Sequence, residues 1–193
     1  QGMVLVFSFI GAVVSSCLVN CLQGFIAVWI GDEHVMPMSW VIVIVLNNYL
    51  SEVMSPIWMF RETMGLFQQV KYVLLVTAGL NIVLSIALGI PFGVPGILFA
   101  TALSKLMYQY WYEPKLLFHL KFKKSMKNFF SNQFRQFGAG ICSVIVSWFA
   151  CSFLEEGLIG LIIRALLSAM LAFGITYIFN CRSNAWNLLY HRY

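Results

Sequence analysis

Long apolar stretches alternate with short polar breaks along the whole chain. Each stretch is close to the roughly 20 residues that a helix needs to cross a bilayer, and none shows the strict alternation of barrel strands. Backbone groups inside hydrocarbon must form hydrogen bonds within the protein, so runs of this length are helices. The pattern predicts an all-α polytopic transmembrane bundle of about six spans, over residues 4–30, 38–60, 72–90, 96–112, 137–153 and 158–179.

Composition supports this pattern. Of the 193 residues, 61% are hydrophobic and 10% are charged, whereas about 25% are charged in a typical soluble domain. Six spans with short connections leave no room for a soluble catalytic domain, so we expect one membrane domain over residues 1–193. The apolar run starts at Met3 without a basic segment or a cleavage site, so we expect it to be a membrane span and not a signal peptide. We expect the chain to be a fragment of a longer protein.

Charge predicts an orientation. When the connections are assigned alternately to the two sides, every lysine and arginine outside the spans falls on one side, which the positive-inside rule makes cytoplasmic. Both ends of the chain then face the cytoplasm. The opposite side carries Asp32, Glu33, Glu155 and Glu156. The residues on the basic side are Arg61, Lys71, Lys115, Lys121, Lys123, Lys124, Lys127, Arg135, Arg182 and Arg192.

The connection expected over residues 113–136 is basic and aromatic. Such a segment resembles a nucleic-acid patch, but a basic cluster beside anionic lipid explains it with fewer assumptions, at about 1 kcal/mol per charge. We therefore expect membrane lipids and no nucleic acid as its partner. The five cysteines lack a CxxC pair and lie mostly inside apolar runs, which is typical of buried free thiols.

Polar residues recur on one face of each of the first four spans, at helical spacing. Polar groups inside a membrane are costly and tend to face neighbouring helices or water, so four such stripes are consistent with a shared aqueous cleft. The candidate substrate-pathway residues on them are Asn20, Gln23, Asn48, Glu52, Asn81, Thr101, Lys105, Tyr108 and Tyr112.

A second interpretation is that the stripes connect helices, because Ser, Thr, Asn and Gln commonly hydrogen-bond across membrane bundles. Charged residues favour the cleft, since a packing role rarely needs one. Lys105 lies about 14 Å into its span at 1.5 Å per residue, and Glu52 would pair with it, carry a proton or neutralise another neighbour. Arg164 is a further pathway candidate, which would otherwise snorkel or pair with Glu155 or Glu156.

Enzyme motifs are absent from the sequence: we find no HExxH, GxSxG or P-loop, and no paired-aspartate metal site. His34, His119 and His191 all fall in connections or in the tail. We therefore expect no catalytic residue, no metal and no cofactor, with coupling to H⁺ or Na⁺ as an open possibility.

Three elements resemble one family of membrane transporters. They are Ala27–Gly31 at the end of the first span, Asn81–Leu84 in the third, and Gly93–Ser104, which matches a G-x-x-G-x-x-x-A-T-x-x-S pattern leading into the fourth. Their order and spacing are similar to those of the polysaccharide and oligosaccharide-lipid flippases of the multidrug/oligosaccharidyl-lipid/polysaccharide exporter superfamily. The likeness covers most of the chain, although the bulky residues at 97–99 and Lys105 after the serine depart from the family pattern.

The resemblance implies the C-terminal lobe of a two-lobe transporter of the MATE-like fold, working with an N-terminal lobe of the same protein. Its implied substrate is an undecaprenyl-pyrophosphate-linked oligosaccharide, flipped by alternating access across the bacterial inner membrane for O-antigen, capsule or exopolysaccharide synthesis. Two alternatives are a drug or metabolite antiporter of the same superfamily and a polytopic transferase or assembly subunit acting on lipid-linked sugars. An antiporter of cations would favour an acidic cleft, whereas Lys105 and Arg164 outnumber Glu52 here.

The charge asymmetry predicts the result of cysteine labelling. A single cysteine introduced near Lys123 is expected to react only from the cytoplasmic side, and one near His34 only from outside, because every basic connection lies on one side. An impermeant maleimide applied to intact spheroplasts measures this. Labelling of the Lys123 site under those conditions would overturn the six-span orientation.

Overall fold

A computed structural model describes residues 2–119, 127–154 and 157–181, and every regular element within them is a helix. Five of these helices are long and apolar enough to cross a membrane, so the predicted all-α polytopic fold is confirmed and the chain is a membrane protein. The elements are α1 (Gly2–Trp29), η1 (Asp32–His34), α2 (Met38–Thr63), α3 (Phe67–Phe92), α4 (Val94–Ser104), η2 (Lys105–Gln109), α5 (Tyr110–Leu117), α6 (Lys127–Cys151) and α7 (Leu158–Asn180).

The fourth span expected from the sequence corresponds to three consecutive pieces. α4, the π-helical segment η2 and α5 follow one another without a break from Val94 to Leu117. The basic connection is shorter than the expected 113–136, because α5 continues to Leu117 and α6 already begins at Lys127. The early start of α6 has a physical reason: Gln133 and Gln136, whose polarity suggests a loop, are buried in the bundle with partners there.

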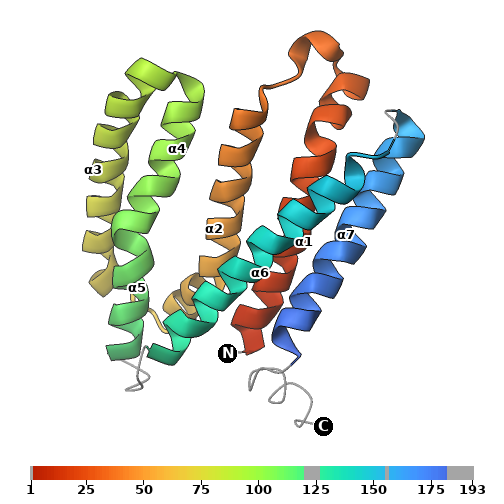
Figure 1. Cartoon of the computed structure of the whole chain (residues 1–193). Coiled ribbons are helices and arrows are strands. Elements are labelled where there is room, and N and C mark those ends of the chain that lie inside the picture. Colours follow the sequence, from red (N-terminus) through yellow and green to blue (C-terminus); the bar gives the residue numbers. More distant parts are fainter. Residues whose placement is uncertain (1, 120–126, 155–156, 182–193) are drawn as a thin grey trace. The chain divides into compact units, whose positions relative to one another are not determined.

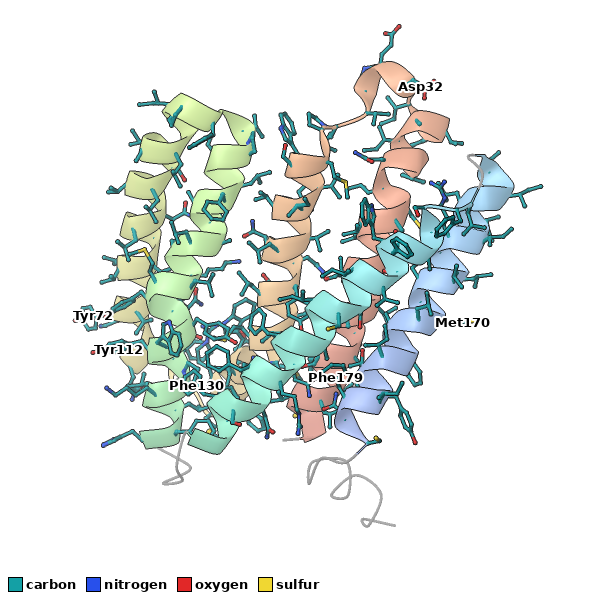
Figure 2. The ribbon with its side chains drawn as sticks, viewed as in Figure 1. Asp32, Tyr72, Tyr112, Phe130, Met170 and Phe179 are labelled. Carbon is teal, nitrogen blue, oxygen red and sulfur yellow. The ribbon has the colours of Figure 1, made fainter. Side chains whose placement is uncertain are left out.

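On α7, side chains are distributed in the reverse of the soluble pattern. The buried residues of α7 are small or polar and recur every fourth position: Ser168, Ala172, Thr176 and Asn180. Large apolar side chains face outward, as Met170 does with 70% of its surface exposed (Figure 2). This arrangement suits a helix surrounded by lipid, where apolar side chains gain nothing from burial and small residues allow close helix contact.

The chain forms two compact units. Unit 1 contains residues Gln1–Val53 and Ser131–Tyr193, and unit 2 contains Met54–Phe130. α2 and α6 therefore each contribute residues to both units. The expectation of a single membrane domain stays a prediction.

In unit 1, α1 and α7 run side by side (Figure 1). Cys17 of α1 contacts Ser168 of α7, with 3.4 Å between Sγ and Oγ. On another side of the unit, Tyr49 of α2 donates to the carbonyl oxygen of Gln136 at 2.7 Å, and its ring lies against Gly140 of α6. A Cβ atom at Gly140 would come within 2.6 Å of the Tyr49 hydroxyl oxygen, so only glycine allows this contact.

In unit 2, α3 and α4 form a tight antiparallel hairpin (Figure 1). α3 ends where Gly93 adopts a φ of +65°, a conformation that costs glycine little. The chain then packs back on itself at Gly96, where a Cβ atom would collide with the carbonyl oxygen of Leu88. Side-chain hydrogen bonds from Asn81 hold the two helices together further along the hairpin.

The close approach at Gly96 makes it the most sensitive glycine of this hairpin. Gly96→Ala is expected to destabilise the protein by about 1–3 kcal/mol, the usual cost of forcing extra volume into a packed contact. Gly79→Ala is the matched control, because a Cβ atom added to Gly79 of α3 would have nothing within 4 Å. Thermal unfolding of both variants in detergent tests this, and equal melting temperatures would contradict the hairpin geometry.

Candidate functional site

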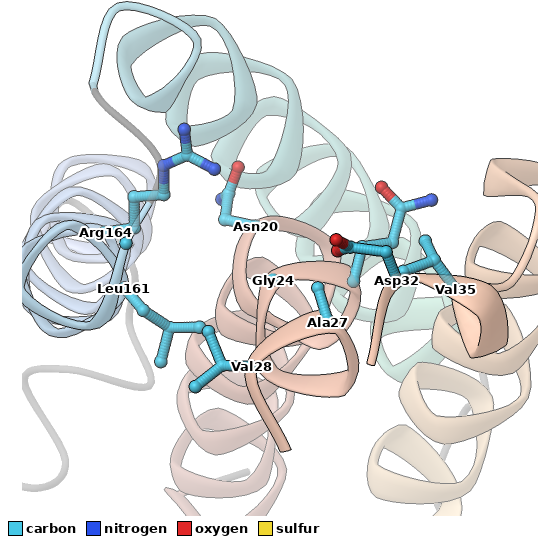
Figure 3. Close-up of a pocket in the computed structure, with 10 residues that line it drawn as sticks. Asn20, Gly24, Ala27, Val28, Asp32, Val35, Leu161 and Arg164 are labelled. Atoms are coloured by element: carbon cyan, nitrogen blue, oxygen red, sulfur yellow. The ribbon is translucent and has the colours of Figure 1, made fainter. Parts of the chain in front are cut away.

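A cavity lies in unit 1, where α1, the turn after it and the start of α7 meet (Figure 3). Its volume is about 540 Å³. It collects three of the pathway residues predicted from the sequence, Asn20, Gln23 and Arg164, and adds Asp32. The remaining lining residues are Gly24, Ala27, Val28, Val35, Gly157 and Leu161.

The two amide side chains are oriented by hydrogen bonds. Asn20 donates from Nδ2 to the carbonyl oxygen of Ser16 at 2.8 Å and to Oγ of Ser147 on α6 at 3.1 Å. Gln23 donates from Nε2 to the carbonyl oxygen of Met36 at 3.0 Å. Because the donors of both amides face the protein, their carbonyl oxygens remain as acceptors beside the cavity.

Arg164 supplies the positive charge of this cavity. Its Nη2 donates to the carbonyl oxygen of Leu154, which fixes the guanidinium near the start of α7. Its Nε is buried and has no hydrogen-bond partner within the described part of the chain. Pairing with Glu155 or Glu156 was one expectation, but both glutamates lie outside the described residues. In Figure 3 the guanidinium and Asn20 point toward one another, and Asp32 lies across the cavity from Arg164.

The lining of this cavity suits a ligand that is both anionic and hydroxylated. A guanidinium carries five N–H donors and binds phosphate or carboxylate oxygens in a fixed geometry. The amide oxygens of Asn20 and Gln23, together with the Asp32 carboxylate, accept hydrogen bonds from hydroxyl groups. The cavity therefore combines an anion-binding group with hydroxyl-binding groups, a combination that matches a phosphorylated sugar.

Asn48 and Glu52 lie elsewhere in unit 1, on α2. Glu52 is half-buried against Gly11 of α1, where an added Cβ atom would come within 3.1 Å of the Glu52 Cβ. The Nδ2 atom of Asn48 is buried and has no hydrogen-bond partner among the described residues. Lys105 belongs to unit 2, so the pairing of Glu52 with Lys105 stays a prediction.

Asn81 and Thr101 meet in unit 2. Asn81 donates from Nδ2 to Oγ1 of Thr101 at 3.1 Å and to Oγ of Ser104 at 3.3 Å, and Ser85 donates to its Oδ1 at 3.3 Å. These bonds join α3 to α4 within the hairpin. Asn81 and Thr101 therefore connect the third and fourth spans by a hydrogen bond, as the interpretation of the polar stripes as helix-to-helix contacts predicts.

Lys105, Tyr108 and Tyr112 continue along the same helix. Lys105 is half-buried at the residue where the chain changes from α-helix to the π-helical segment. The rings of Tyr108 and Tyr112 stack with centroids 4.8 Å apart. π-helical turns inside α-helices frequently mark functional positions, which keeps Lys105 among the candidates.

A buried amide cluster in unit 1 was not predicted. Gln136 donates from Nε2 to Oδ1 of Asn180 at 2.6 Å, and Asn180 donates back to Oε1 of Gln136 at 3.2 Å. Both side chains are buried, and Tyr49 donates to the backbone carbonyl of Gln136. Little in the sequence indicates this amide cluster, because Gln136 falls in the expected connection and Asn180 lies just past the expected end of the last span.

A second missed cluster, in unit 2, contains the buried carboxyl group of Glu113. Arg61 donates to it from α2 and Gln109 donates to it from the preceding helical turn. The hydropathy pattern placed Arg61 and Glu113 in breaks between the expected spans. The spacing of Gln109 and Glu113, four residues apart, is the one available signal that they share a helix face.

The reciprocal amide pair can be tested by a double-mutant cycle. Asn180→Leu strands the buried Gln136 amide and Gln136→Leu strands Asn180, so we expect each single change to lower the unfolding free energy by about 1–3 kcal/mol. The double variant Gln136→Leu with Asn180→Leu removes both polar partners and is expected to recover most of that loss. Chemical denaturation in detergent measures the cycle, and additive effects of the two single changes would exclude the pair as a coupled unit.

No family model matches the chain, no curated protein matches it, and no solved structure matches it. The relation to polysaccharide flippases therefore rests on the sequence elements quoted above and stays a prediction. The observations that bear directly on function are the membrane fold and the chemistry of the cavity in unit 1.

Proposed function

We propose that this chain takes part in moving a lipid-linked oligosaccharide across a membrane. The observation that carries the proposal is the cavity of about 540 Å³ with Asn20, Gln23, Asp32 and Arg164 in its wall. A polar cavity of this size is costly in a membrane helix bundle unless it serves a ligand or water. Its chemistry favours a phosphorylated sugar.

The physical need for such a protein is clear from the bilayer. A sugar repeat unit carries many hydroxyl groups and cannot cross about 30 Å of hydrocarbon without losing their hydrogen bonds. The lipid tail of the same molecule can stay among the acyl chains during the transfer. A transporter therefore has to offer replacement hydrogen bonds to the sugar and a positive charge to the phosphate, as the amides and Arg164 of unit 1 do.

The finer proposal follows the sequence resemblance. The substrate is an undecaprenyl-pyrophosphate-linked repeat unit, and the membrane is the bacterial inner membrane, with both ends of the chain in the cytoplasm. This chain is the C-terminal lobe, which rocks against an N-terminal lobe to give alternating access. In that orientation the Asp32 end of α1 faces outward, so the cavity belongs to the side on which the substrate is released.

Substitution of Arg164 tests this proposal against its alternatives. Arg164→Gln, introduced in the complete gene, is expected to lower surface polysaccharide about tenfold or more. The reason is the loss of a charge-assisted contact with the substrate, worth at least about 1.4 kcal/mol. Arg164→Lys keeps the charge without the planar fork and is expected to retain part of the activity. Complementation of a strain that lacks its own flippase measures both.

The matched control is Lys115→Gln, which removes an exposed positive charge from α5 outside the cavity. It is expected to leave complementation unchanged, with membrane abundance checked for every variant. Lys105→Ala tests the second basic candidate in the same assay. Wild-type polysaccharide from Arg164→Gln would remove the cavity from the transport pathway, and new export of small cations by that variant would favour the antiporter.

A further inference from the structure

Glu113 is a buried acid that the proposed sugar-binding cavity does not use. Its side chain is only 1% exposed. Oε1 accepts two hydrogen bonds, from Nη1 of Arg61 at 3.1 Å and from Nε2 of Gln109 at 2.9 Å. Oε2 is buried and has no hydrogen-bond partner within the described residues. Oε1 thus accepts two hydrogen bonds and Oε2 accepts none, although the buried Nε1 of Trp58, itself without a hydrogen-bond partner in the described part of the chain, lies close to this carboxyl group.

A small cavity lies against the same group. It has a volume of about 10 Å³, which is near the minimum needed for one water molecule. Its polar lining comes from Glu113 and Arg61, and the rest of its wall is apolar: Ile57, Leu66, Val70, Leu116 and Leu117. An unpartnered carboxyl oxygen beside such a space has room for a proton or a single water and for nothing larger.

The cluster around Glu113 contains more acidic groups than basic ones. Arg61 pairs with Glu113 and also with Glu62, whose nearest oxygen lies 3.5 Å from Nη2. Two carboxylates therefore share one guanidinium. The Glu62 side chain is 58% exposed and is solvated, so the excess negative charge is most costly at the buried Glu113.

The other charged or titratable groups on the described elements around this cluster include Lys105 of η2, which is half-buried, and three exposed groups. Lys71 of α3 is exposed, and it donates to Gln68 and lies over the ring of Tyr72. Lys115 of α5 and His119 after it are exposed as well. Arg61 is the cation that contacts the buried carboxyl group in the described part of unit 2.

We propose that Glu113 is a proton-binding site. A proton from a solvent hydronium ion adds to Oε2, the carboxylate becomes a neutral carboxyl group, and a water molecule is left behind. The new O–H is directed at the small cavity, while Arg61 stays charged and keeps Glu62 as its counter-ion. Protonation removes the ionic part of the link between α2 and α5, so occupancy of the site controls how firmly these two helices are held together.

The test is an infrared titration of the purified chain in lipid nanodiscs. Exposed glutamates ionise near pH 4.3, so a protonated-carboxyl band that persists at about pH 6 reports a buried acid. We expect Glu113→Gln to abolish that band. Glu62→Gln and Glu52→Gln, which remove an exposed and a half-buried carboxyl group, are expected to keep it. A band that survives Glu113→Gln, or is absent from the unmodified chain, would overturn the proposal.

Arg61→Gln provides an independent measurement should Glu113→Gln fail to fold. Loss of a nearby positive charge favours the protonated acid, so the affinity for the proton is expected to rise about tenfold or more, seen as a titration midpoint at higher pH. An unchanged midpoint would contradict the site. Neither experiment requires transport, so a normal titration combined with failed complementation would reject the proposed function and leave the proton site in place.

Discussion

A polar group inside a membrane protein is costly unless it finds a partner, and the contacts between the described helices reflect that constraint. Lipid tails solvate leucine as well as a protein core does, so apolar side chains provide little force that brings helices together. The buried stripe of α7 consists instead of Ser168, Ala172, Thr176 and Asn180. Small residues permit close contact between backbones. Ser168 and Thr176 donate to carbonyl oxygens of their own helix, and Asn180 donates to Gln136 of α6. Gly140 beneath the Tyr49 ring shows how little space such contacts leave.

The same constraint explains what the family-like sequence pattern does in this chain. Gly93 forms the turn, Gly96 permits the close contact, and Thr101 and Ser104 accept hydrogen bonds from Asn81. All of these roles hold α3 against α4. The pattern is therefore a packing signal, which bears on how the helices are built and not on what the protein binds. The chemistry available to a ligand lies in the cavity of unit 1, which Arg164 and the amides of Asn20 and Gln23 line.

Local hydropathy was sufficient to predict the helices but not their partners. Windows of about 20 residues find apolar spans, and helical spacing within a span identifies its polar face. Partners that lie far apart in the sequence leave no such signal: Tyr49 bonds to Gln136 across 87 positions, and Asn180 bonds to Gln136 across 44. The cavity likewise depends on the pairing of α1 with α7. Polarity was also misleading at the helix ends, where Gln133, Gln136 and Glu113 were assigned to a connection although they are buried.

Arg61 and Arg164 differ in how their charge is compensated, and this difference separates their roles. Arg61 has a carboxylate at 3.1 Å and a second at 3.5 Å, so its charge is already neutralised and a further anion would gain little from it. Arg164 donates to the backbone carbonyl of Leu154 and forms no ion pair among the described residues. An arriving anion would therefore add a charge-assisted hydrogen bond at Arg164. Arg164 is therefore suited to hold an anionic ligand, and Arg61 to hold the protein's own helices.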